Sequence, residues 1–326
     1  MIKQVRDTPV ESAGAVDAAG QSAFLREAAS YQFANALATD SRPGPELLAY
    51  DLSARLLVLS DLGDASPITA LLKHSDAASV TNSLMAMAQA LGRMHAATVG
   101  REDDFAALLR RVGLPDTADG ISAQIPDALA EVPRMLASEL GIANTPEAFF
   151  ARVERSGRLF AHGGSRAFSP SDLCPDNIIV NEEGVRFLDY EWGGFRDATL
   201  DITYALASFP GCLCHFDLST DLAQAMIDAW RAEVVGIWPH LADDAVLASR
   251  ILDAQLIWVW LTTYWFLPDD HTRIAAARAH HLSVPRSDAL ISRWGALVAQ
   301  AHRTGDSDVA DFAGGVVSAL EAKWTR

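Results

Sequence analysis

One stretch in the middle of the chain constrains the fold more than any other. Two short apolar runs, Ile178–Val180 and Val185–Leu188, are separated by a tight turn that ends in glycine, and this pattern predicts a β-hairpin. Polar side chains flank the hairpin: Asp172 and Asn177 precede its first strand, and Asp189 follows its second. The outer ends of antiparallel strands joined by a short turn lie side by side, so we expect these three groups to converge.

Two carboxylates and an amide at one point suit phosphoryl transfer. Mg²⁺ takes few protein ligands, commonly carboxylate and amide oxygens, and an aspartate must accept the proton of the attacking hydroxyl. The segment from Asp172 to Asn177 has the Asp-to-Asn spacing of a kinase catalytic loop, and Asp189 occupies the second metal position. The alternative is a hairpin that happens to end in acidic residues. Each residue alone is ordinary turn chemistry, but their joint order favours the catalytic interpretation.

This segment resembles the aminoglycoside phosphotransferase and choline kinase-like small-molecule kinases. Their signature runs His-Gly-Asp-Leu-His-Pro-x-Asn, a strand, Asp-Trp/Tyr-Glu, a glycine, and then Asp-x-x-x-Asp-Leu-Ala. The corresponding residues here are Pro170-Ser-Asp-Leu-Cys-Pro-Asp-Asn177, Leu188-Asp-Tyr-Glu191, Gly194 and Asp197-Ala-Thr-Leu-Asp201-Ile202. The departures lie in the catalytic loop, where Pro170 and Ser171 replace His-Gly and Cys174 replaces the second histidine.

The resemblance implies an α+β, protein-kinase-like fold with two lobes: a reduced, β-rich N-lobe over residues 1–62 and a mostly helical C-lobe over residues 63–326. It also implies ATP-dependent or GTP-dependent phosphorylation of a hydroxyl on a small molecule, such as an aminoglycoside, an amino sugar or choline. Asp172 would orient that hydroxyl and act as the base. Asn177 and Asp189 would hold Mg²⁺ against the phosphates.

The same resemblance assigns nucleotide-binding residues in the N-lobe. Lys3 lies in a short β-compatible segment and would clamp the nucleotide phosphates. Glu27 lies in the amphipathic helix predicted over residues 22–37 and would pair with Lys3. The segment before Gly63 resembles the family's hinge, whose backbone binds adenine; its residues are Ser60, Asp61 and Leu62.

The family's first two strands and its Gly-rich loop should precede Lys3, and this sequence has no counterpart for them there. Gly14 and Gly20 lack the Gly-Lys-Ser/Thr ending of a P-loop. We expect that the N-lobe is truncated, that the sequence starts inside a longer frame, or that nucleotide binding is altered. The competing hypothesis is therefore a catalytically impaired, kinase-like binding or regulatory protein. A binding module has no need of Asp172, Asn177 and Asp189 together, which argues for the enzyme.

The composition of the chain limits the classes of partner and substrate that it can bind. The 326 residues suffice for one large or two modest domains, and the net charge of −16 argues against a nucleic-acid partner. An acidic protein suits a cationic small-molecule acceptor, although such a charge mostly reports solubility. The N-terminus lacks the apolar core of a signal peptide, and the most apolar run, residues 256–267, is shorter than the roughly twenty residues needed to cross a bilayer. We expect a cytoplasmic protein without a membrane partner.

The three cysteines are too few for a disulfide framework, and we interpret them as reduced thiols. Cys212, Cys214 and His215 could form a soft-metal site, but two thiols one residue apart cannot both reach a tetrahedral ion comfortably without further partners.

Several other side chains are assigned supporting roles. His95 is expected to be packed or capping, and Asp201, by resemblance, to hydrogen-bond the backbone of the catalytic loop. Four aromatic side chains do not fall on one helix face, so some are expected to line a cleft, although a core position is the default; they are Trp258, Trp260, Tyr264 and Trp265.

Overall fold

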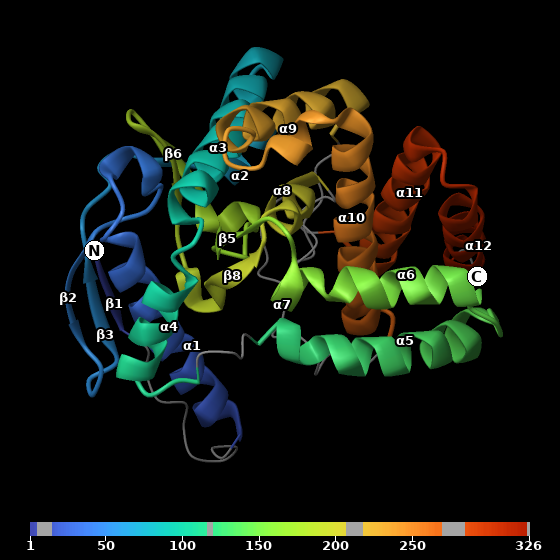
Figure 1. The fold of residues 1–326 in the computed structure, drawn as a ribbon, viewed down its shortest axis with the longest axis horizontal. Helices are drawn as coiled ribbons and strands as arrows, with labels where there is room; N and C mark the ends of the chain where they lie inside the picture. The colour runs from blue at the N-terminus through green and yellow to red at the C-terminus, as the bar shows by residue number, and fades with distance from the viewer. Residues whose placement is uncertain (5–14, 116–119, 207–217, 269–283, 325–326) are drawn as a thin grey trace.

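The computed structural model describes residues 1–4, 15–115, 120–206, 218–268 and 284–324. Figure 1 shows a small sheet with helix α1 at one end of the molecule and a larger, mostly helical part at the other. This is the α+β arrangement expected from the sequence. The proposed metal set of Cys212, Cys214 and His215 lies outside the described residues.

The N-terminal part is a three-stranded antiparallel sheet covered by one helix. Its strands follow the order β1-β3-β2. Lys3 lies opposite Leu57, which is fully buried, so both side chains lie on the face of the sheet turned towards α1. The elements are β1 (Ile2–Gln4), α1 (Ala15–Ala34), the 3₁₀ turn η2 (Thr39–Ser41), β2 (Leu47–Asp51) and β3 (Leu56–Leu59).

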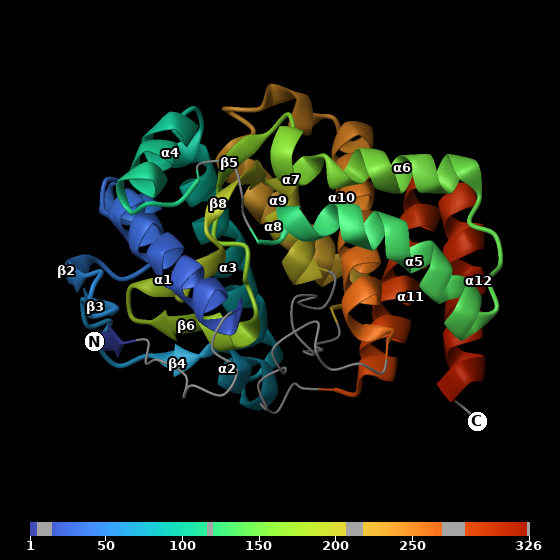
Figure 2. The same ribbon diagram turned by 90° about the horizontal axis from the view of Figure 1, so that it is seen from below.

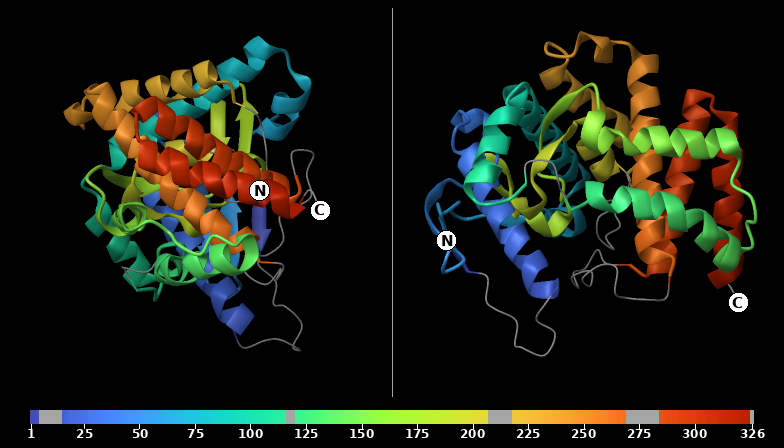
Figure 3. Two further views of the ribbon diagram at one scale, coloured as in Figure 1. Left: turned by 90° about the vertical axis from the view of Figure 1, so that its right-hand side faces the viewer. Right: turned by 60° about the horizontal axis from the view of Figure 1, so that its bottom comes forward.

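The larger part is built mainly from helices. Between the sheet and the predicted catalytic loop lie β4 (Ser66–Pro67), α2 (Ile68–His74), α3 (Ala77–Thr98), α4 (Glu102–Arg111), η3 (Ser122–Gln124), α5 (Ile125–Leu140), α6 (Glu147–Gly157) and α7 (Leu159–His162). After the hairpin come α8 (Thr199–Leu206), α9 (Thr220–Val234), η6 (Pro239–Ala242), α10 (Asp244–Phe266), α11 (Arg286–Thr304) and α12 (Ser307–Trp324). Figure 3 shows α11 and α12 side by side at the end of the molecule.

Two small sheets carry the central hairpin. Strands β6 (Ile178–Asn181) and β7 (Gly184–Phe187) pair from Ile178 opposite Phe187 to Asn181 opposite Gly184, which confirms the predicted hairpin. Strand β4 pairs with the outer side of β6. Strands β5 (Arg166–Ser169) and β8 (Gly194–Asp197) form a second antiparallel pair that leads into and out of the hairpin segment. The short 3₁₀ turns η4 (Pro175–Asn177) and η5 (Tyr190–Trp192) flank the hairpin.

Helix α10 is the centre of the helical part. It contacts α5, α6, α8 and α11, and Figures 1 and 2 show α5 and α6 lying across it. In the part of the chain that the structure describes, it is the one helix long and apolar enough to cross a membrane. It has 23 residues rather than the apolar twelve judged too short from sequence, but 67% of its most apolar window is buried inside the molecule. A core helix surrounded by other helices has this composition.

The tryptophans of α10 belong to this core. Trp258 and Trp260 are fully buried and Trp265 is 6% exposed, so the default core position is confirmed for these tryptophans and a place in a cleft is wrong for them. Tyr264 is partly buried and packs against the same core. Each indole N–H has a partner: Trp258 donates to the Leu200 carbonyl at 2.8 Å, Trp260 to the Ala128 carbonyl at 3.1 Å, and Trp265 to Gln124 at 2.8 Å. These bonds allow indoles to be buried on several sides of one helix.

Candidate active site

The hairpin brings the predicted metal ligands together. The Leu188 N–H donates to the Asn177 carbonyl at 2.8 Å, which extends the β6–β7 ladder by one step and places Asn177 beside the residue before Asp189. Asp189 then takes a left-handed conformation with φ of 61°, and its N–H donates to the Tyr31 hydroxyl at 3.2 Å. The local backbone therefore turns the Asp189 side chain out of the strand and towards α1.

A single cation joins the two parts of the molecule at this point. The Lys3 ammonium lies 2.8 Å from the Glu27 carboxylate and 2.7 Å from Asp189 Oδ1. The contact predicted between Lys3 and Glu27 is present, and the contact with Asp189 is one that the sequence did not suggest. Lys3 therefore links β1, α1 and the loop after β7, although its role as a phosphate clamp stays a prediction.

Burial shapes the charge states in this cluster. Burial raises the pKa of Glu27 to about 7, while the neighbouring ammonium of Lys3 acts in the opposite direction. Burial alone would lower the pKa of Lys3, but its attraction to Glu27 and Asp189 is stronger, so that pKa is raised. The two carboxylates thus account for the raised pKa of Lys3, whereas at Glu27 burial and the nearby Asp189 carboxylate outweigh the effect of Lys3.

Asp172 is held on one side of its carboxylate. Its Oδ1 accepts hydrogen bonds from the Cys174 N–H at 3.3 Å and from the Tyr204 hydroxyl at 3.2 Å. Burial raises the pKa of Asp172 to about 6; Asp176 and Asp189 add to this effect and the two hydrogen bonds oppose it. Sequence reasoning missed Tyr204. Its spacing of three residues from Asp201, which places both on one side of a helix, was the available signal.

The backbone before Asp172 is strained. Ser171 has φ of 67°, and the Asp172 N–H donates to the Pro170 carbonyl at 2.9 Å. This bond between residues two apart closes a γ-turn of the rare kind with positive φ. Ser171 thus occupies a conformation that glycine adopts without cost, at the position where the resembling family has glycine.

Cys174 differs from expectation. It is 3% exposed and disulfide-bonded, so the prediction of a reduced thiol is wrong for Cys174.

The donor set fits Mg²⁺. The Asn177 side-chain N–H donates to the Asp172 carbonyl at 3.3 Å, so the amide oxygen is the end of Asn177 left for a ligand. Asp189 adds a carboxylate that is 17% exposed. The described ranges contain no group of three or more His, Cys, Asp or Glu side chains that could by itself hold a metal ion. One amide and one carboxylate, completed by water and phosphate oxygens, is a typical protein contribution to Mg²⁺.

The predicted hinge residues connect the two parts of the molecule. Ser60 exchanges hydrogen bonds with Glu46, since its N–H donates at 2.8 Å and its hydroxyl accepts at 2.9 Å. The Leu62 carbonyl accepts from the Asn181 side chain at 2.8 Å, and Asp61 accepts from the Gly63 N–H at 3.0 Å. The segment is thus anchored both to the N-terminal sheet and to β6. Its role in binding adenine stays a prediction.

A buried network supports the catalytic loop. Asp201 accepts from Ser169 at 2.7 Å, and His95 Nε2 donates to it at 3.0 Å. The Trp230 indole N–H donates to His95 Nδ1 at 3.0 Å, which fixes the neutral tautomer with its proton on Nε2. Arg196 donates to the Ser169 hydroxyl at 2.9 Å. Asp201 therefore supports the loop through the Ser169 side chain rather than through the backbone as expected.

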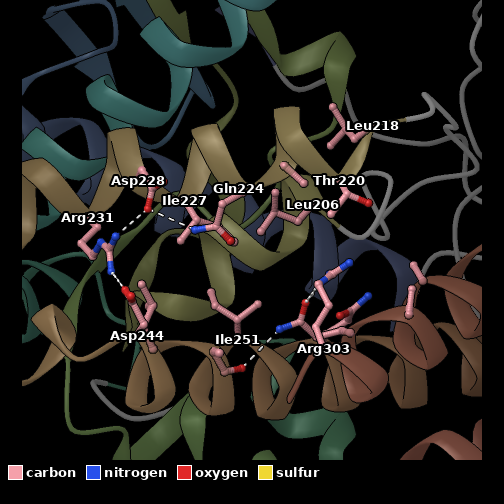
Figure 4. A pocket seen from close by; sticks show the side chains of 17 residues that line it. Leu206, Leu218, Thr220, Gln224, Ile227, Asp228, Arg231, Asp244, Ile251 and Arg303 are labelled. Carbon is pink, nitrogen blue, oxygen red and sulfur yellow. Dashed lines mark hydrogen bonds and ion pairs between the residues drawn. The ribbon is translucent and has the colours of Figure 1, made fainter. Parts of the chain in front are cut away.

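A cavity of about 570 Å³ lies elsewhere, between α9, α10 and α11. Figure 4 shows that its charged side chains face one another: Arg231 contacts both Asp228 and Asp244. None of the predicted site residues lines it. It is therefore separate from the site built around Asp172 and Asp189.

Comparisons with known proteins bear on the fold. No protein-family model and no curated protein matches the sequence. Among solved structures, a choline/ethanolamine kinase family protein from Mesorhizobium loti superposes with a TM-score of 0.52 at 15% identity, over 90% of this chain and 83% of that one. The choline kinase LicA from Streptococcus pneumoniae gives 0.44 at 13% identity, over 87% and 83%. The first likeness shows that this chain has the protein-kinase-like fold expected from the sequence.

The buried network generates a stability prediction. His95→Leu removes one of the donors to the buried Asp201 carboxylate, and we expect a loss of about 1–3 kcal/mol in the free energy of unfolding. His95→Gln keeps a side-chain N–H donor and should lose less than half as much. Urea denaturation followed by circular dichroism measures both. Equal losses for the two variants would show that packing, rather than the hydrogen bond to Asp201, determines the role of His95.

The strained turn generates a second prediction. The Ser171 hydroxyl is buried without a hydrogen-bond partner among the described residues. Ser171→Ala removes this hydroxyl and should raise the free energy of unfolding by about 1 kcal/mol. Ser171→Gly also removes the Cβ that makes positive φ costly and should add about 1 kcal/mol more. The same denaturation experiment ranks the variants, and a wild type more stable than both would contradict the strain.

Proposed function

We propose that this protein is an ATP-dependent phosphotransferase that phosphorylates a hydroxyl of a small molecule. The observation that carries the proposal is the convergence of five groups from distant parts of the chain. Lys3, Glu27 and Asp189 form one ion cluster, and Asn177 and Asp172 lie beside it along the hairpin ends. A phosphate clamp, two metal ligands and a base are the parts that phosphoryl transfer requires.

Each side chain has a role that its surroundings support. Lys3, held by Glu27, binds the nucleotide phosphates. Asn177 and Asp189 hold Mg²⁺, which when bound neutralises the charge on the phosphate oxygens. Asp172 accepts the proton of the acceptor hydroxyl, and the segment Ser60–Leu62 receives the base of ATP or GTP. Lys3 contacts Asp189 at 2.7 Å. The Asp189 carboxylate would become available to Mg²⁺ if Lys3 turned to the nucleotide phosphates.

The acceptor is proposed to be a small cationic alcohol. The M. loti structure is described as a choline/ethanolamine kinase family protein, and the net charge of −16 favours a cation over an anion. Amino sugars and aminoglycosides carry the same combination of amine and hydroxyl. We therefore infer a kinase for an amino alcohol, with choline and ethanolamine as the first acceptors to test.

The alternative is a kinase-like binding protein without catalytic activity. It is motivated by the departures from the family in the catalytic loop, namely Pro170, Ser171 and Cys174. The contacts of Asp172 and Asp189 favour the enzyme, because both carboxylates are positioned by several neighbours. The two hypotheses differ in whether bound Mg·ATP is turned over.

Titration calorimetry with ATP, with and without Mg²⁺, tests the nucleotide site. We expect binding that requires Mg²⁺ and a dissociation constant raised at least about tenfold in Asp189→Ala, because the metal loses its carboxylate ligand. The matched control is Asp103→Ala on the exposed face of α4, which should bind like wild type. Wild-type protein that is folded yet binds no ATP would contradict the proposal.

Product analysis with choline, ethanolamine and glucosamine then tests transfer. Asp172→Asn should retain Mg·ATP binding and lose about 10²–10⁴-fold in turnover, because proton transfer by a positioned base contributes that much. Binding of Mg·ATP by wild type without phosphorylation of any such acceptor would favour the non-catalytic hypothesis.

A further inference from the structure

Hydrogen bonds to one oxygen fix the orientation of the Asp172 carboxylate. Both of its hydrogen bonds, from the Cys174 N–H and the Tyr204 hydroxyl, end on Oδ1. Within the described part of the chain, Oδ2 accepts no hydrogen bond. A carboxylate held in this way presents a single oxygen to an approaching hydroxyl.

The two donors differ in how firmly they can fix the Asp172 carboxylate relative to the rest of the protein. The Cys174 N–H comes from the same loop as Asp172, two residues further on, so it moves with that loop. Tyr204 belongs to α8, which packs against α10 and α9 (Figure 1). Among the described residues, the bond from Tyr204 is the one that ties the carboxylate to a different element of the C-lobe.

Tyr204 is itself rigidly placed. Its side chain is 1% exposed, and its ring lies edge-on to Trp258 with centroids 5.1 Å apart. The Trp258 indole donates to the Leu200 carbonyl of the same helix at 2.8 Å. The first turn of α8 is fixed by Asp197, which accepts from the Thr199 N–H at 3.1 Å and from its hydroxyl at 2.6 Å. The phenol ring therefore has little freedom to follow a moving carboxylate.

We propose that Tyr204 is a positioning residue for the phosphoryl transfer: it holds Asp172 Oδ1 so that Oδ2 faces the acceptor hydroxyl. This inference rests on the proposed function. In the transfer, the acceptor O–H bond breaks as its oxygen bonds to the γ-phosphorus, the proton passes to Oδ2, and the bond to the β,γ-bridging oxygen breaks to leave ADP. Tyr204 touches none of the reacting atoms and acts through Asp172.

The variant that isolates this role is Tyr204→Phe, which keeps the ring and its contact with Trp258 and removes only the hydroxyl. We expect kcat to fall about tenfold to a hundredfold, because a misplaced catalytic group loses reactivity steeply. The dissociation constant for Mg·ATP should stay within about twofold of wild type. The control is Tyr50→Phe, the same change on the half-exposed face of β2, with kcat expected unchanged.

If the Tyr204 hydroxyl only stabilised the fold, Tyr204→Phe would behave differently. It would lower the melting temperature and change nucleotide affinity and turnover together, rather than kcat alone. Turnover of Tyr204→Phe equal to that of wild type, with the acceptor that wild type phosphorylates, would overturn the proposal.

Crystal structures of wild type and Tyr204→Phe test whether the Tyr204 hydroxyl orients the Asp172 carboxylate, and this test does not depend on an activity assay. We expect the Asp172 carboxylate to rotate away from its wild-type orientation, or to occupy more than one, once the hydroxyl is absent. An unchanged single orientation would overturn the proposal. Failure of the proposed function is distinguishable, because wild type would then phosphorylate no acceptor while the comparison of the two structures still reports whether Tyr204 orients Asp172.

Discussion

The ion cluster at Lys3 is the interaction on which the arrangement of the two parts depends. One ammonium, 32% exposed, is shared by a buried carboxylate of α1 and by the carboxylate after β7. Because Glu27 is almost fully buried, an unpaired charge there would cost several kcal/mol, so the folded molecule requires Lys3 near it. Through Lys3, the same cluster joins β1 to the residue that follows the hairpin, Asp189. Lys3 thus stabilises the fold and is also the candidate phosphate-binding group.

Acidic groups outnumber cations at this point, and this governs what the site can bind. Glu27 and Asp189 share one lysine. Burial first, and then repulsion from Asp189, raises the pKa values of both Glu27 and Asp172. A divalent cation relieves that repulsion better than a second lysine, because it carries two charges in a small volume. The electrostatics of the cluster thus agree with the ligand types of Asn177 and Asp189.

The sequence predicted the hairpin and the convergence at its ends, because turn residues and strand alternation are local signals. It could not predict contacts between residues far apart: His95 meets Asp201 across 106 positions, and Tyr204 meets Asp172 through the packing of α8. The tryptophans of α10 were misjudged for a related reason. A helix-face argument assumes one buried side, whereas α10 is enclosed by four other helices. The pairing of Lys3 with Glu27 came from resemblance, since nothing in the spacing requires it.

The catalytic loop keeps its conformation although its residues depart from the family signature, because other hydrogen bonds hold it. Pro170 cannot supply an N–H, yet its carbonyl closes the turn with Asp172 at 2.9 Å. Ser171 accepts positive φ, and the surroundings over-determine that strain: Ser169 is bound to Asp201 before the turn, and Asp172 to Tyr204 after it. The loop thus depends less on the identity of residues 170 and 171 than on two anchors in α8. A comparison of the motif residue by residue would suggest that Pro170 and Ser171 disrupt the loop. The hydrogen bonds show that Asp172 is nevertheless held in place.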